Sequence, residues 1–187
     1  MPRGNKELWL SLLAGVIITA IYAFVVFLTH AIPSASELFG HTLGILGFLL
    51  MLMTEILYSL RKRSRTARWG RMSAWLQFHI FTGLVGPYMV LLHTSWKFNG
   101  LAGATTLLTV IIVVSGFIGR YIYTRIPRTL DGIEIETPTG QNQSAALARA
   151  RRLLAIWHVV HIPIGMALFT AAFIHIGAAL YYATLMR

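Results

Sequence analysis

Five long apolar stretches, separated by short polar segments, dominate the hydrophobic pattern of the chain. They cover about residues 8–30, 42–60, 73–95, 101–123 and 153–182. Each holds the roughly 20 apolar residues that a helix needs to cross the hydrocarbon core of a bilayer. The pattern therefore predicts an all-α membrane helix bundle with five transmembrane helices. Residues 1–187 are expected to form a single membrane domain, with a polar loop at 124–152.

Composition supports a membrane protein and excludes several kinds of site. The chain is 56% hydrophobic and only 12% charged, and it contains no cysteine. A soluble domain of this size needs far more polar surface. The missing cysteines exclude disulfides, iron–sulfur clusters, thiolate-bound metals and covalently attached haem. The first apolar stretch is longer than the core of a signal peptide, so we expect it to remain as an anchor.

The positive charges are distributed unevenly along the chain, whose formal net charge is +10. Fourteen of the sixteen Lys and Arg residues lie before the first stretch, between the second and third, or between the last turn of the fourth and the start of the fifth. The two exceptions are Lys97 and Arg187. The positive-inside rule then predicts a cytoplasmic N-terminus and a C-terminus outside. Because the charge follows topology, nucleic-acid binding is not expected. A bacterial or archaeal cytoplasmic (inner) membrane is the expected location.

Two pairs of histidines share one spacing within these stretches. His79 and His93 lie in the third stretch, and His161 and His175 lie in the fifth, with 14 residues between the members of each pair. In a helix, 14 residues span roughly 21 Å and return to within about 40° of the same face. The charge pattern makes the third and fifth helices parallel. We therefore expect His79 beside His161 near the cytoplasmic surface, and His93 beside His175 near the outer surface.

Two imidazole pairs at two depths indicate two bis-histidine haems. Neutral imidazole is a strong axial ligand for haem iron, and unpaired polar side chains are costly within a membrane. Without cysteine, both groups would be non-covalent haem b. Glycines close to the histidines are expected to leave room for the macrocycles, although close helix packing also favours glycine. They are Gly83, Gly86 and Gly165.

Other polar residues are candidates for supporting roles. His158 is turned about 100° from the face of His175, so we expect it at the cytoplasmic end of its helix, near a haem propionate or in solvent. Cations for the propionates are available inside and outside. They are Arg68, Arg71, Arg151 and Arg152 on the inner side, and Lys97 and Arg187 on the outer side. Several aromatic residues fit interfacial belts; they include Trp9, Trp75, Trp96 and Tyr181.

Glu55 is the only acid well inside a predicted span. It is a candidate quinone and proton site beside the inner haem, since intramembrane carboxylates are functional candidates by default. The equally weighted alternative is a carboxylate that snorkels to the interface or pairs with a loop arginine such as Arg61. His30 and His41 flank the outer loop between the first two spans and are candidates for a quinone or partner site there.

The histidine pattern resembles integral-membrane di-haem b-type cytochromes. In the ferric reductase and NADPH oxidase transmembrane domain, and in cytochrome b of quinol-oxidising complexes, two parallel helices each carry two histidines about 13–14 residues apart. The use of the third and fifth spans is more similar to the ferric reductase type. So is the segment Trp157–His161, with a tryptophan shortly before the first ligand of the fifth span. The resemblance covers about residues 73–182.

This resemblance implies a di-haem cytochrome b subunit of a respiratory-chain complex. It would transfer electrons across the membrane between quinone or quinol and partner redox subunits, such as an extracytoplasmic cytochrome c or iron–sulfur protein, in contact with lipid. The loops are too short for a flavin domain, so the alternative is a ferric or oxygen reductase core fed by a separate flavoprotein. A hypothesis from another class is a haem-free membrane transporter or assembly factor.

Overall fold

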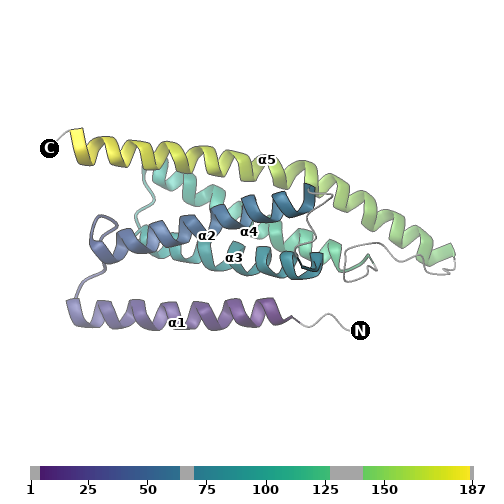
Figure 1. Cartoon of the computed structure of the whole chain (residues 1–187), viewed down its shortest axis with the longest axis horizontal. Coiled ribbons are helices and arrows are strands. Elements are labelled where there is room, and N and C mark those ends of the chain that lie inside the picture. The colour runs from purple at the N-terminus through teal and green to yellow at the C-terminus, as the bar shows by residue number, and fades with distance from the viewer. Residues whose placement is uncertain (1–4, 64–69, 127–140, 186–187) are drawn as a thin grey trace. The chain divides into compact units, whose positions relative to one another are not determined.

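The computed structural model describes residues 5–63, 70–126 and 141–185, and this part of the chain contains helices and no strands. Figure 1 shows the helices, which are α1 (Lys6–Thr29), α2 (Leu38–Arg63), α3 (Met72–His93), α4 (Gly100–Tyr123) and α5 (Gln141–Leu185). All five are long and apolar enough to cross a membrane. The prediction of an all-α membrane protein with five transmembrane helices is therefore confirmed. The orientation of the termini stays a prediction.

The fifth helix differs from the prediction. It begins at Gln141 rather than near residue 153, so the second half of the predicted loop 124–152 is helical. Residues 141–152 are rich in Ala, Arg and Gln, which favour helix without being apolar enough to signal a membrane span. The 45 residues of α5 extend over about 68 Å, more than twice the hydrocarbon core. The alternating segment 133–136, predicted as a short strand or hairpin, lies outside the described residues.

The helices form two compact units, one made of α1, α2 and α3 and the other of α4 and α5. In the first unit, α3 packs against both α1 and α2. Leu43 of α2 meets Val85, Met89 and Leu92 of α3 in a buried cluster. The hydroxyl of Thr19 on α1 is 2.5 Å from that of Tyr88 on α3. α3 is therefore the central helix of this unit.

Two glycines allow α2 and α3 to approach very closely. A Cβ atom added at Gly86 would lie 2.9 Å from the carbonyl oxygen of Gly47, and one added at Gly47 would lie 2.8 Å from that of Gly86. Two turns after Gly47 on α2, the Thr54 hydroxyl donates a buried 2.6 Å hydrogen bond to the hydroxyl of Thr82, which lies one turn before Gly86 on α3. Small residues at helix crossings and hydroxyl bonds across them are typical of membrane helix pairs.

In the second unit, α4 packs against α5. Ile126, just beyond α4, is only 1% exposed and packs with Ala150 and Leu154 of α5. Closer to the middle of the helices, Trp157 lies against Gly119, where any Cβ would overlap the indole ring. These contacts run in opposite directions along the two helices, so α4 and α5 are antiparallel. The early start of α5 thus extends its packing along the end of α4.

Candidate functional site

Both histidines of α3 turn one ring nitrogen toward the backbone of α2. His93 Nδ1 lies 2.8 Å from the carbonyl oxygen of Gly40. His79 Nδ1 lies 3.4 Å from the carbonyl oxygen of Thr54, a longer and weaker contact. Tyr58 of α2 packs on the His79 ring with the centroids 4.7 Å apart. Both imidazoles are only partly buried. The predicted ligands of α3 are thus oriented by the neighbouring helix.

These contacts fix where the imidazole proton sits. A carbonyl oxygen only accepts hydrogen bonds, so Nδ1 of His93 carries the proton. The same holds for Nδ1 of His79, whose hydrogen bond is longer and weaker. In a neutral imidazole the lone pair then belongs to Nε2, on another edge of the ring. Metal-bound histidines usually donate the N–H of their second ring nitrogen to a carbonyl or carboxylate in this way. In the two α3 histidines the ring nitrogen with the lone pair is therefore Nε2.

The ring of His93 lies against a glycine of α2 that sequence reasoning did not single out. A Cβ at Gly44 would lie 2.8 Å from Cγ and Nδ1 of His93. At Gly40, whose carbonyl accepts from His93, a Cβ would overlap the carbonyl of Ser34. Gly40, Gly44 and Gly47 recur at intervals of four and three residues. This spacing places the three glycines on one helix face, and it was the sequence signal from which this close contact could have been predicted.

In the second unit, His161 is held by α4 and by its own helix. Its Nδ1 lies 2.9 Å from Oγ of the buried Ser115. The indole of Trp157 stacks on the imidazole, with centroids 4.5 Å apart and an interplanar angle of 30°. Trp157 Nε1 donates to the carbonyl of Ser115 at 2.7 Å and to its Oγ at 3.1 Å. Ser115 is a second residue that sequence reasoning missed, because a lone serine in an apolar span carries no pattern.

The remaining histidines of α5 differ from His161 in their surroundings. His158 Nδ1 lies 2.9 Å from the Leu154 carbonyl of its own helix, so it too carries its proton on Nδ1. By tautomer alone His158 therefore resembles a ligand as much as His93 does, and only its face and depth set it aside. His175 is partly buried.

The structure describes each histidine pair within its own unit. His79 and His93 belong to the first unit, and His161 and His175 to the second. The expected pairing of His79 with His161 and of His93 with His175 therefore stays a prediction. Within the described ranges, no three His, Asp or Glu side chains gather into a metal site. A haem iron between two imidazoles needs only two protein ligands. A bis-histidine haem site therefore does not require three gathered side chains.

The three glycines predicted to make room for haem have different neighbours. Gly86 is buried in the close contact with Gly47, which gives it a helix-packing role. A Cβ at Gly83 would be an ordinary 3.6 Å from the Thr54 methyl group, and one at Gly165 would be 3.9 Å from Ile112. Space beside these two positions stays a predicted feature of the haem sites.

Glu55 lies on an exposed face of α2. Its described partner is Ser59, whose hydroxyl donates to Oε1 at 3.3 Å. Arg61, the proposed loop partner, donates instead to the carbonyl of Gly70 at 3.2 Å. His30 and His41 are both exposed at one end of the first unit, where His30 ends α1 in the left-handed conformation.

The candidate propionate cations are exposed where they are described. These are Arg71, Lys97, Arg151 and Arg152. Arg68 and Arg187 lie outside the described residues. The contact of these cations with haem propionates, on the inner and on the outer side, therefore stays a prediction.

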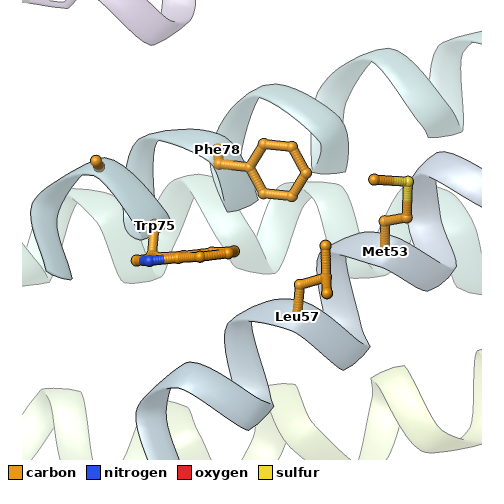
Figure 2. Close-up of a pocket in the computed structure, with 5 residues that line it drawn as sticks. Met53, Leu57, Trp75 and Phe78 are labelled. Atoms are coloured by element: carbon orange, nitrogen blue, oxygen red, sulfur yellow. The ribbon is translucent and has the colours of Figure 1, made fainter. Parts of the chain in front are cut away.

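An apolar groove of about 310 Å³ opens between α2 and α3, close to His79 in sequence. Figure 2 shows Met53 and Leu57 from α2 converging with Trp75 and Phe78 from α3. Ala74 completes the lining, and Glu55 is not part of it. The groove is thus lined in part by α3, the helix that carries His79, but the Glu55 carboxylate does not line it.

Comparisons with protein-family models, with curated proteins and with solved structures find no match to this chain. Its function must therefore be inferred from its own residues.

Proposed function

We propose that the chain is a di-haem b-type cytochrome subunit that transfers electrons across a membrane. His79 and His161 would ligate one haem, and His93 and His175 the other. The observation that carries this proposal is the hydrogen bond between His93 Nδ1 and the Gly40 carbonyl, with the weaker equivalent at His79. Both hydrogen bonds leave Nε2, with its lone pair, as the atom that would ligate the iron. The 14-residue spacing of these two histidines, repeated by His161 and His175, is what distinguishes them from histidines that only bridge helices.

The chain's residues fit the group that the proposal requires. The backbone acceptors orient the imidazoles and raise their basicity, which strengthens them as ligands. The glycine at 44 lets the His93 ring lie against α2. When bound, the two haems supply reversible one-electron transfer. The spacing of 14 residues, roughly 21 Å, would place one near each membrane surface.

This placement would put an electron donor at one surface and an acceptor at the other. A membrane quinone or quinol at one surface and partner redox subunits, such as a cytochrome c or iron–sulfur protein, at the other would complete the path. Glu55 would carry the proton that accompanies quinone chemistry, since an intramembrane carboxylate is suited to that role. A bacterial or archaeal cytoplasmic membrane is the proposed setting.

Haem stoichiometry in matched histidine variants tests the proposal. We expect two haem b per wild-type chain and one in His93→Ala, because the second ligand set remains intact. His41→Ala is the matched control: it removes an exposed histidine of the same unit and should keep both haems. A folded His93→Ala chain that retains two haems, or loses both, would overturn the assignment.

A further inference from the structure

His161 differs from the α3 histidines in the chemistry of its Nδ1 partner. The partner of His93 is a carbonyl oxygen, which only accepts. The partner of His161 is the hydroxyl of Ser115, which can donate or accept. The Ser115 hydroxyl therefore does not by itself decide the tautomer of His161. The other hydrogen bonds of this hydroxyl decide it.

Trp157 supplies the second constraint on this hydroxyl. Its indole N–H can only donate, and it points at both the carbonyl and the Oγ of Ser115, at 2.7 and 3.1 Å. The Oγ thus already accepts one hydrogen bond. Its single proton needs an acceptor, and among the described residues the partner in reach is His161 Nδ1. If Ser115 donates to Nδ1, its Oγ accepts from Trp157 and its proton has an acceptor.

Packing keeps the three side chains in this arrangement. Trp157 lies in the notch at Gly119 and stacks on the His161 ring, so neither ring can turn independently. Ser115 is 9% exposed, which excludes most competing water. Hydrogen bonds within such a buried network hold its members firmly.

We propose that Ser115 and Trp157 are positioning residues that hold His161, in the haem-free chain, with its proton on Nε2. Resting on the proposed function, this implies that haem ligation by His161 requires a change of tautomer. Nε2 gives its proton to water, Nδ1 takes one from water, and the imidazole stays neutral. The Ser115 hydroxyl rotates and accepts from Nδ1. His161 then has a gated tautomer, unlike His93.

Nitrogen NMR of the full-length, histidine-labelled chain, prepared without haem, tests this directly. The His161 signal is assigned by its loss in His161→Gln. In the wild type we expect an unprotonated Nδ1. Ser115→Ala should shift His161 toward the Nδ1-protonated form, and Ser115→Thr, which keeps the hydroxyl, should restore the wild-type signal. Thr109→Val is the matched control, since the described hydrogen bond of the buried Thr109 hydroxyl goes to the Thr105 carbonyl of its own helix.

Trp157→Phe keeps an aromatic ring over His161 but removes the indole donor. It should also raise the Nδ1-protonated fraction, because the Oγ is then free to accept from His161. A wild-type signal with a protonated Nδ1, or no change in Ser115→Ala, would overturn the proposal.

The haem-loaded chain gives a second readout. Ser115→Ala should shift the midpoint potential of one haem upward and leave the other unchanged, because the ligand loses the acceptor that increases its basicity. Equal shifts of both potentials, or of neither, would count against the role of Ser115. Failure of every variant to bind haem would defeat the proposed function, while the tautomer measurement still decides the role of Ser115.

Discussion

Adding one methyl group at Gly44 should disturb a haem ligand while leaving the fold nearly unchanged. In Gly44→Ala the new Cβ would lie 2.8 Å from Cγ and Nδ1 of His93. Carbon atoms in contact prefer about 3.5–4.0 Å, so the ring must move by roughly 1 Å. That movement breaks the 2.8 Å hydrogen bond to the Gly40 carbonyl. The clash is with a side chain that can swing, so the helices need not separate.

The energies of this change nearly cancel for folding but not for haem binding. Losing the hydrogen bond costs about 0.5–1.5 kcal/mol, and replacing glycine by alanine within a helix returns about 1 kcal/mol. Losing an outer-sphere partner of a metal-bound histidine typically costs about 10–100-fold in metal affinity. We therefore expect Gly44→Ala to unfold at nearly the wild-type temperature and to bind one of its two haems about 10–100-fold more weakly.

Haem titration and thermal unfolding of the purified chain in detergent measure both quantities. Gly15→Ala is the matched control, because nothing lies within 4 Å of the added Cβ in that apolar helix. If Gly44→Ala binds both haems as tightly as Gly15→Ala does, the reasoning about His93 is refuted.

Three further predictions concern the fold and the topology. Gly86→Ala should destabilise the chain by about 1–3 kcal/mol, because the obstacle is the backbone of α2; thermal unfolding should show less effect for Gly83→Ala, and equal effects would contradict the close packing. Ile126→Ala should cost about 2–5 kcal/mol in denaturant unfolding, and a neutral result would show that α5 does not depend on this contact. Because the chain lacks cysteine, a single Ser36→Cys should react with an impermeant thiol reagent added outside intact cells and Ala148→Cys should not; the reverse would invert the predicted topology.

The helices were predictable where hydropathy defines them. The bounds of α3 and α4 agree with the predicted spans 73–95 and 101–123 to within two residues, because their ends coincide with polar segments. The start of α5 was not predictable in this way. Residues 141–152 are polar and basic, and a hydropathy pattern marks what crosses a membrane rather than where a helix begins.

The candidate site was predictable only in its side chains. The repeated spacing identified the histidines, but the acceptor for His93 is the carbonyl of Gly40, and every residue has a carbonyl. Only the fold of α2 against α3 selects that one. Gly86 shows the converse: its place midway between His79 and His93 predicted space for a haem, and its described neighbour is the backbone of Gly47.

The central claim is tested most directly by the visible absorption and haem content of the purified wild-type chain. After reduction with dithionite, the account predicts the α-band of low-spin haem b and two haems per chain. A folded, membrane-extracted chain with no such band, even after haem is supplied, would contradict it.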